Sequence, residues 1–347
     1  MYDVAIVGSG PAGASCAAFS AMAGLRTVLI DRAIFPREKV CGDCINPNCW
    51  PVLERLGVAE EVHAASHGKL SRVDFITVDG AVVTAPLPDG PNSEIAIRRS
   101  LFDQILLRRA LSLGVEVRQG ETLLSAAHNG HWGIATDRSE ARSRVLVAGD
   151  GRNSTVARLC GLMPRKGPDR VALQTHVPLP RDFGDRIVLQ LLREGYSGQA
   201  PVGDGLLNLC LVSGPSNLAT IRRWAEQKFA ISPAHDWRTI APLARAALPS
   251  AMPGLFLVGD AARVVEPFTG EGIAYALRSG ELAAKAIVAG DHLQYADAHR
   301  KLYAGRLWIN ALARHAVEHP LLATRLLRFL PNEKSVLRIL TTKVVRP

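Results

Sequence analysis

The chain opens with Asp3-Val4-Ala5-Ile6-Val7-Gly8-Ser9-Gly10-Pro11-Ala12-Gly13, and far along it comes Gly254-Leu255-Phe256-Leu257-Val258-Gly259-Asp260-Ala261. Each segment reads as an apolar strand that ends in a glycine turn. In the first segment, Gly8 permits a tight turn, Gly10 lets the backbone approach a pyrophosphate, and Gly13 lets the next helix pack on the strand. Together the two segments favour a flavin dinucleotide that is held at both ends.

The residues around the first turn support this interpretation. A helix is predicted over 12–23, and its N-terminus, with Pro11 and Ala12, would direct unpaired N–H groups at the phosphates. A second apolar strand over 26–30 ends at Asp31. An acid there, roughly 20 residues past the glycines, is placed to accept hydrogen bonds from the ribose hydroxyls of the adenosine half.

Four segments resemble the flavoprotein superfamily that contains the group A aromatic hydroxylases and the geranylgeranyl reductases. They are the Gly-Ser-Gly-Pro-Ala-Gly turn with Asp31-Arg32, the segment 97–106 with Arg98, the segment 146–158 with Asp150-Gly151, and the segment 258–273. The resemblance covers about residues 1–165 and 250–290. It implies non-covalent FAD as the cofactor.

The expected fold is α/β. The resemblance implies a Rossmann-like FAD-binding domain of the p-hydroxybenzoate hydroxylase-like type over 1–165 and 246–295, with part of 66–97 on the substrate side. An antiparallel-sheet substrate domain is expected over 166–245, where the runs 185–192 and 205–212 read as strands. A basic helical region would follow over 296–347.

The other expected cofactor contacts follow from the same motifs. By resemblance, Arg98 contacts the flavin or its phosphates, and Asp150, Gly151, Gly259 and Asp260 lie along the cofactor. Asp150 also suits an N-cap for a helix over 154–159. Near the flavin we expect Pro267 and Thr269, and then Gly270, Glu271, Gly272 and Ile273 at the start of a helix. N–H groups at that helix start would stabilise negative charge on a reduced flavin.

Three cysteines cluster as Cys41-Gly42-Asp43-Cys44-Ile45-Asn46-Pro47-Asn48-Cys49. A metal site would need a fourth ligand, which the spacing does not provide, so we predict no metal. A redox-active pair of Cys41 and Cys44 stays open. By resemblance to the geranylgeranyl reductases, the segment that begins at Lys39 is a flavin-side loop. Cys41 and Gly42 would then line the flavin, and Cys44 or Asn46 would touch the substrate.

The middle region is less specific about the substrate. Gly195-Tyr196-Ser197-Gly198-Gln199-Ala200-Pro201 resembles the geranylgeranyl reductase motif Gly-Tyr-x-Trp-x-x-Pro, with Gly198 in place of the tryptophan. The Trp-x-Trp-x-Ile-Pro signature of flavin halogenases is absent, because Trp237 stands alone. No second GxGxxG motif occurs between about 150 and 250, so NAD(P)H would visit the flavin only transiently as an electron donor.

Charge is concentrated near the end of the chain. Residues 296–347 hold ten Lys or Arg and three acids, which gives +7 of the chain's formal +9. This pattern fits either a basic helical cap on the substrate pocket or a surface for an anionic partner, such as a carrier protein or a membrane. Nucleic acid is not expected as a partner, because no motif for it accompanies the charge. Reduced cysteines and the lack of a signal sequence or long apolar run predict a cytoplasmic location, peripheral to a membrane if the anionic surface is one.

The predicted function is therefore that of an FAD-dependent oxidoreductase with a lipophilic substrate, either small or carrier-bound. In the first version, hydride transfer at flavin N5 reduces a C=C bond, or the reverse dehydrogenation occurs. In the second, an NAD(P)H-dependent monooxygenase hydroxylates an aromatic or polyketide-like substrate. A third alternative is a flavin-bearing docking subunit without turnover.

Overall fold

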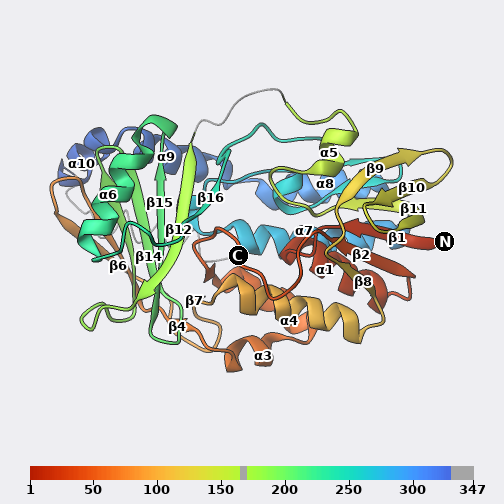
Figure 1. Cartoon of the computed structure of the whole chain (residues 1–347), viewed down its shortest axis with the longest axis horizontal. Helices are drawn as coiled ribbons and strands as arrows, with labels where there is room; N and C mark the ends of the chain where they lie inside the picture. Colours follow the sequence, from red (N-terminus) through yellow and green to blue (C-terminus); the bar gives the residue numbers. More distant parts are fainter. Residues whose placement is uncertain (165–169, 330–347) are drawn as a thin grey trace.

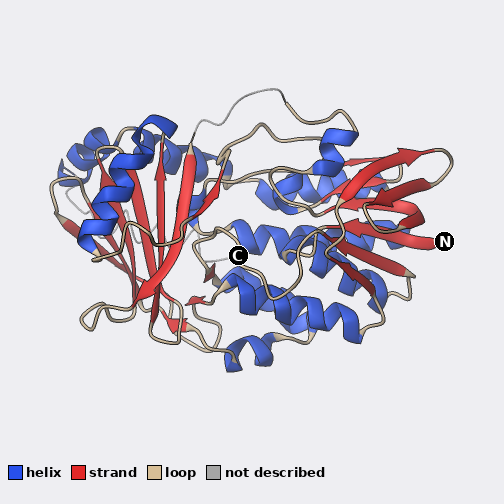
Figure 2. Ribbon diagram, in the orientation of Figure 1, coloured by secondary structure: helices blue, strands red, loops and turns tan. Residues whose placement is uncertain are grey.

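A computed structural model describes residues 1–164 and 170–329 of the chain (Figure 1). Two large β-sheets stand at opposite ends of an elongated molecule, with helices between and around them (Figure 2). A small sheet of three short strands lies between the large ones and consists of β3 (Cys44–Ile45), β7 (Ile95–Ala96) and β4 (Gly68–Lys69). The predicted α/β class is confirmed.

The first large sheet has eight strands among the described residues, and five of them run parallel in the order β18-β11-β1-β2-β8. These five are β1 (Tyr2–Val7), β2 (Thr27–Asp31), β8 (Glu116–Gln119), β11 (Glu140–Ala148) and β18 (Leu255–Leu257). Three antiparallel strands extend the sheet: β9 (Leu123–His128), β10 (Trp132–Thr136) and β17 (Ala251–Met252). The two glycine segments of the sequence thus end parallel strands of one sheet.

Both faces of this sheet are covered, which explains why its strands are apolar without alternation. On one face, Ile6 and Leu29 pack with helices α1 (Pro11–Met22), α2 (Trp50–Leu56), α4 (Arg99–Ser112) and α7 (Gly272–Ala289). On the other face, Val7 and Ile30 pack against β10 and the short helix α5 (Thr155–Leu159). Helix α3 (Ala59–Ala64) packs beside α2, and α8 (His292–Tyr303) packs beside α7.

The second large sheet has the order β16-β12-β15-β14-β13-β5-β6. Its strands are β5 (Arg72–Ile76), β6 (Val82–Pro86), β12 (Val171–Pro178), β13 (Arg186–Leu192), β14 (Gly195–Pro201), β15 (Leu206–Ser213) and β16 (Arg238–Ile240). The prediction of an antiparallel sheet is wrong for one pair of strands, because β5 pairs with β13 in parallel. This pair joins strands from separate parts of the chain, whereas the neighbouring strands β13, β14 and β15 follow one another through tight turns.

Helices cover both faces of the second sheet. Leu211 points to the face covered by α6 (Leu218–Lys228), and the adjacent Val212 points to the face packed by residues of α9 (Leu307–Glu318) and α10 (Pro320–Phe329). Figure 1 shows α9 and α10 at this end of the molecule. The predicted basic region is helical as far as it is described. Its Lys and Arg residues at 334, 338, 343 and 346 lie outside the described residues. Within residues 1–164 and 170–329, none of the helices combines the length and apolar character that a membrane span requires.

Candidate active site

The glycine turn after β1 has the geometry of a phosphate cradle. Gly8 has a φ of +99°, and a Cβ on Gly13 would stand 1.8 Å from the Gly8 carbonyl oxygen, so neither position admits a side chain. Helix α1 begins at Pro11, whose missing N–H costs nothing at this position. Gly10 is the N-cap and has no side chain to satisfy the N–H groups of the first turn. These groups are left for an anion.

Three cations surround the open side of Gly10. The nearest atoms to a Cβ built on Gly10 are Arg37 Nη2 at 3.7 Å, Lys39 Nζ at 3.9 Å and Arg99 Nη2 at 4.0 Å. Asp103 offsets part of this charge through ion pairs with Arg37 at 2.8 Å and Arg99 at 2.7 Å. Burial and repulsion from Arg99 and Arg37 lower the pKa of Lys39 to about 8. A pyrophosphate beside Gly10 would supply the missing negative charge.

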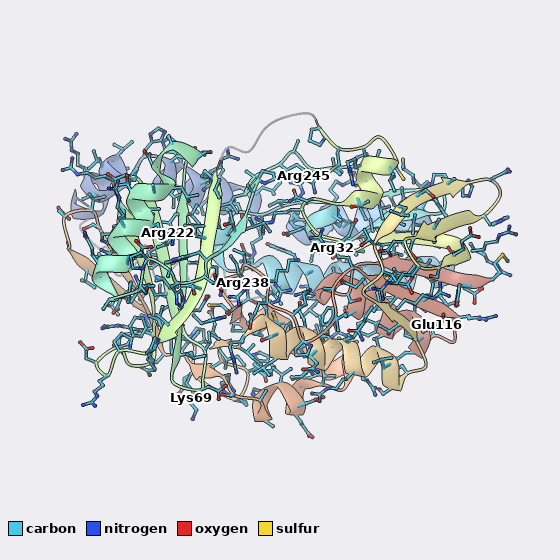
Figure 3. All side chains as sticks on the ribbon, viewed as in Figure 1. Arg32, Lys69, Glu116, Arg222, Arg238 and Arg245 are labelled. Atoms are coloured by element: carbon cyan, nitrogen blue, oxygen red, sulfur yellow. The ribbon has the colours of Figure 1, made fainter. Side chains whose placement is uncertain are left out.

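The predicted ribose acid lies next to this cradle. Asp31 ends β2, is 9% exposed and accepts hydrogen bonds from the Ser9 amide at 2.6 Å and the Ala33 amide at 2.8 Å. Arg32 is exposed and lies beyond the strand end (Figure 3). Neither residue lines the large cavity described below, so their expected contacts with the adenosine half of FAD stay predictions.

The second glycine segment and the Asp-Gly motif meet on the other side of the cradle. Asp150 is not the predicted N-cap, but its side chain accepts hydrogen bonds from the amides of Thr155 at 2.6 Å and Val156 at 3.1 Å at the start of α5. Ser154 is the N-cap itself. Asp260 pairs with Arg152 at 3.1 Å, and both line the cavity. Figure 3 labels Arg245, whose guanidinium donates to the carbonyl oxygens of Asp260 and Ala261.

The 39–44 loop, which is expected beside the flavin, is anchored to the second sheet by side chains of β12 and β15. The Cys41 carbonyl oxygen accepts hydrogen bonds from Asn208 Nδ2 and Cys210 Sγ, each at 3.0 Å. Asp43, with a φ of +60°, is fully buried and lies 2.9 Å from His176 Nε2 through its Oδ2. These contacts hold Cys41 and Gly42 at the cavity wall.

A cavity of about 590 Å³ joins the glycine cradle to the second sheet. Of the predicted site residues, the following line it: Gly10, Pro11, Ala12, Cys41, Gly42, Cys44, Gly151, Asp260, Pro267, Thr269, Gly270, Gly272 and Ile273. Most of the remaining wall is apolar and comes from β5, β13, β14, α9 and α10. Cys44 keeps its proton, because burial raises the pKa of its thiol well above the usual range.

Gly8, Gly13, Asp150 and Gly259 do not line the cavity but shape the turns beside it. Gly8 N donates to the Ile30 carbonyl at 2.7 Å, and Gly259 N donates to Ser279 Oγ at 2.9 Å. A Cβ on Gly259 would also stand 2.9 Å from the Cβ of Ala12. These positions determine the shape of the backbone, and their predicted contacts with the cofactor stay predictions.

Three predicted residues point elsewhere. Arg98 precedes α4 and pairs with Asp204, while its neighbour Arg99, the first residue of α4, lines the cavity. Arg99, and not the predicted Arg98, therefore lies at the cavity, and a contact of either residue with the cofactor stays a prediction. Asn46 is 2% exposed and caps a short 3₁₀ helix (Pro47–Cys49) by accepting from the Asn48 amide, so it is not at the substrate face. Glu271 is buried away from the cavity, where it accepts from the Tyr275 hydroxyl.

Lys39, Arg99 and Glu94 also line the cavity, although none of the three was predicted as a site residue. Lys39 could have been found from its position in the loop that resembles the geranylgeranyl reductases. Arg99 could have been found from the Arg98-Arg99 pair at a helix start. Glu94 is an acid in the otherwise apolar run Glu94-Ile95-Ala96-Ile97. The six cysteines are free thiols, and no cluster of three or more potential metal-binding side chains occurs in the described part of the chain.

The FAD binding domain family model matches residues 1–187, more than half of the chain. The chain belongs to this family. The N–H groups beside Gly10, the cations around it and the adjoining acid Asp31 fit FAD as the cofactor. The protein is therefore an FAD-dependent oxidoreductase.

Two curated relatives agree with this assignment, and a solved structure shares the fold. A menaquinone reductase of Mycolicibacterium smegmatis is 30% identical over 85% of this chain and 78% of its own length. A digeranylgeranylglycerophospholipid reductase of Thermoplasma acidophilum is 27% identical over 82% of this chain and 77% of its own length. A flavin-dependent brominase structure superposes with a TM-score of 0.80 at 22% identity, covering 99% of this chain and 95% of that one. The last similarity supports the fold alone.

Proposed function

We propose that this flavoprotein reduces a C=C bond of a lipophilic, prenyl-type substrate. The observation that supports this most is the apolar cavity, which runs on from the glycine cradle and the 39–44 loop to the sheet wall. Such a wall binds hydrocarbon through burial of apolar surface, at roughly 25 cal/mol per Å². When bound, reduced FAD supplies the hydride at N5.

The chain's own residues have three tasks in this proposal. Gly10, Lys39 and Arg99 hold the pyrophosphate, and Cys41-Gly42 backs the reactive end of the cofactor through its anchors on β15. The cavity wall positions the hydrocarbon and excludes water. Gly198, on β14, lies in that wall with its nearest neighbour, Leu189 Cδ2, 3.7 Å from where a Cβ would stand. A tryptophan here, as in the geranylgeranyl reductase motif, would narrow the cavity.

Two similar proteins are reductases whose names refer to lipophilic molecules with C=C bonds. This supports a reductase over the monooxygenase alternative, for which no residue of the cavity provides a specific signal. A docking subunit without turnover is less well supported, because a large cavity adjoins the cofactor cradle.

We further propose that the substrate enters from a phospholipid surface. Large apolar side chains are 46–59% exposed on two neighbouring helices: Leu307, Trp308 and Leu312 on α9, and Leu321, Leu322 and Leu326 on α10. Leu312 and Leu326 also line the cavity, so the exposed apolar face borders its wall. Basic residues of the same region, including Arg325, would favour anionic lipid.

Steady-state assays would test the reductase proposal. Purified protein with NADPH or dithionite as donor would be offered menaquinone, a digeranylgeranyl phospholipid or a phenolic aromatic, each with and without oxygen. We expect oxygen-independent turnover with a prenyl lipid and saturation of a C=C bond. Substrate-stimulated oxygen uptake with a hydroxylated aromatic product would select the monooxygenase.

A further inference from the structure

Glu94 is a buried acid in the wall of the cavity. It directly precedes β7 of the small sheet, is 6% exposed, and lines the same cavity as Gly10 and Cys41. Within residues 1–164 and 170–329, its carboxyl group has no hydrogen bond or ion pair. The lining of the same cavity includes the apolar side chains of Val73, Leu87 and Ile187.

The other buried carboxyl groups near the cavity have partners. Asp103 pairs with Arg37 and Arg99, Glu266 with Arg170, and Glu271 with Tyr275. An unpaired carboxylate in an apolar wall is costly, so burial favours the protonated, neutral form of such a group. No structural role explains why this one is an acid.

The titratable groups that interact with Glu94 do not stabilise the negative charge of its carboxylate. They are the thiols of Cys44 on β3 and Cys49 on the 3₁₀ helix, and burial raises the pKa of both above the usual range. Lys69, on the neighbouring strand β4, sits opposite Ile95 in register and is exposed at the lower edge of Figure 3. Burial accordingly raises the pKa of Glu94 to about 7. At neutral pH the group is therefore poised between its acid and its carboxylate.

We propose that Glu94 is the catalytic acid of this site and gives its proton to the substrate, an inference that rests on the reductase function proposed above. The C=C π bond breaks and two C–H bonds form. One C–H bond forms with the hydride that reduced FAD supplies, and the other forms with the proton of Glu94. The carboxylate that remains regains a proton from water, and a reduced nicotinamide or another two-electron donor restores the cofactor.

The test compares Glu94→Gln with Glu94→Asp and with Glu60→Gln, a control at an exposed glutamate of α3. Glutamine has the same shape and no acidic proton. We expect Glu94→Gln to lower kcat about 100- to 10,000-fold, the usual range for general acid catalysis. Its FAD content and its reduction by dithionite should equal those of wild type. Glu94→Asp should retain part of the activity, and wild-type turnover should fall as the pH rises through about 7.

A readout that does not depend on turnover is the infrared carbonyl band of a protonated carboxyl group. In the flavin-loaded protein, the difference spectrum between wild type and Glu94→Gln should contain this band at about pH 6 and lose it above about pH 8.

The outcomes separate the two proposals. If wild type turns over and Glu94→Gln matches it with the same pH profile, the role of Glu94 is refuted while the reductase function stands. The role is also refuted if the difference spectrum contains no protonated carboxyl group at about pH 6. If wild type reduces no C=C substrate, the reductase function and the role of Glu94 both fail.

Discussion

The backbone amide of Ser9 donates a hydrogen bond to Asp31 Oδ2 at 2.6 Å. Ser9 lies in the glycine turn after β1, and Asp31 ends the neighbouring strand β2. The acid expected to bind the ribose thus also fixes the turn that binds the phosphates. A change at Asp31 should therefore weaken both ends of the adenosine diphosphate site.

Replacing Asp31 with alanine should lower FAD affinity, because a charge-assisted hydrogen bond is lost. Such bonds contribute about 1.5–3 kcal/mol, so the Kd for FAD should rise roughly 10- to 150-fold. Titration of flavin-free protein with FAD, followed by fluorescence quenching, measures this. Asp3→Ala is a matched control, since Asp3 also accepts a backbone hydrogen bond, from Arg26, at the far end of β1. Equal affinities for the two variants would refute the role of Asp31.

Replacing Gly10 with valine should exclude FAD without unfolding the protein. The backbone at Gly10 has a φ of −70°, which any residue adopts, and the nearest atoms to a new Cβ are the ends of flexible cationic side chains. The side chain would instead occupy the space that the pyrophosphate needs. Absorbance at the flavin band and circular dichroism of the purified variant check this, with Gly214→Val, at a glycine with open space around it, as the control. A yellow Gly10→Val protein with full FAD content would contradict the placement of the phosphates.

The raised pKa of Glu94 predicts how stability depends on pH. The folded protein holds this proton up to about pH 7, whereas the usual value is 4.5, so folding favours the protonated form. The free energy of unfolding of wild type should therefore fall as the pH rises from 4.5 to about 7, by up to about 3 kcal/mol from this group. The Glu94→Gln variant should not lose this part of its free energy of unfolding, because glutamine does not titrate. Urea unfolding of both flavin-loaded proteins at about pH 4 and pH 8 measures the difference, and curves that stay parallel would contradict it.

The proposed lipid surface predicts a defect that appears only with membrane-bound substrate. Leu321 and Leu322 are exposed on α10 and do not line the cavity, so Leu321→Ser with Leu322→Ser should weaken binding to vesicles of anionic phospholipid. Adding Arg325→Glu should weaken it further and reduce the dependence on salt, because exposed charges are screened beyond about 8 Å at physiological ionic strength. Vesicle co-sedimentation measures both effects.

The matched control for this surface is Leu124→Ser on β9, a leucine that is 58% exposed on the first sheet. FAD content and turnover of a short, detergent-soluble substrate should be unchanged in every variant. If the double variant binds vesicles like wild type, α9 and α10 do not form a lipid surface. The same follows if wild type does not bind vesicles and takes its substrate only from a carrier protein.

Local sequence patterns predicted the parts of the site that depend on backbone shape. The turn at Gly8, the start of α1 at Pro11 and the helix start near Gly272 each need particular residues at fixed spacings, and those can be read directly. The pairing of β5 with β13 could not be read this way, because it depends on contacts between segments about a hundred residues apart. The difference between Arg98 and Arg99 depends partly on such contacts, since Arg98 pairs with the distant Asp204 whereas Arg99 pairs with Asp103 of its own helix.

Glu94 illustrates the same limit for chemistry. In the sequence it is one of many acids, and its significance comes from three short strands that bury it beside Cys44. Likewise, Lys39 becomes part of a phosphate cradle only when the loop folds back over Gly10. Motifs predicted the cofactor, whereas tertiary structure was needed to find the buried position of Glu94 and the apolar wall.

The most direct test of the central claim, reduction of a lipophilic C=C bond at the flavin, is a single anaerobic turnover. Protein reduced with dithionite is mixed with a prenyl lipid in detergent, and flavin absorbance is followed while the lipid is analysed by mass spectrometry. We expect oxidised flavin to return, with one C=C bond saturated for each flavin reoxidised. A reduced flavin that stays reduced with every C=C lipid, yet reoxidises with oxygen and hydroxylates an aromatic substrate, would contradict it.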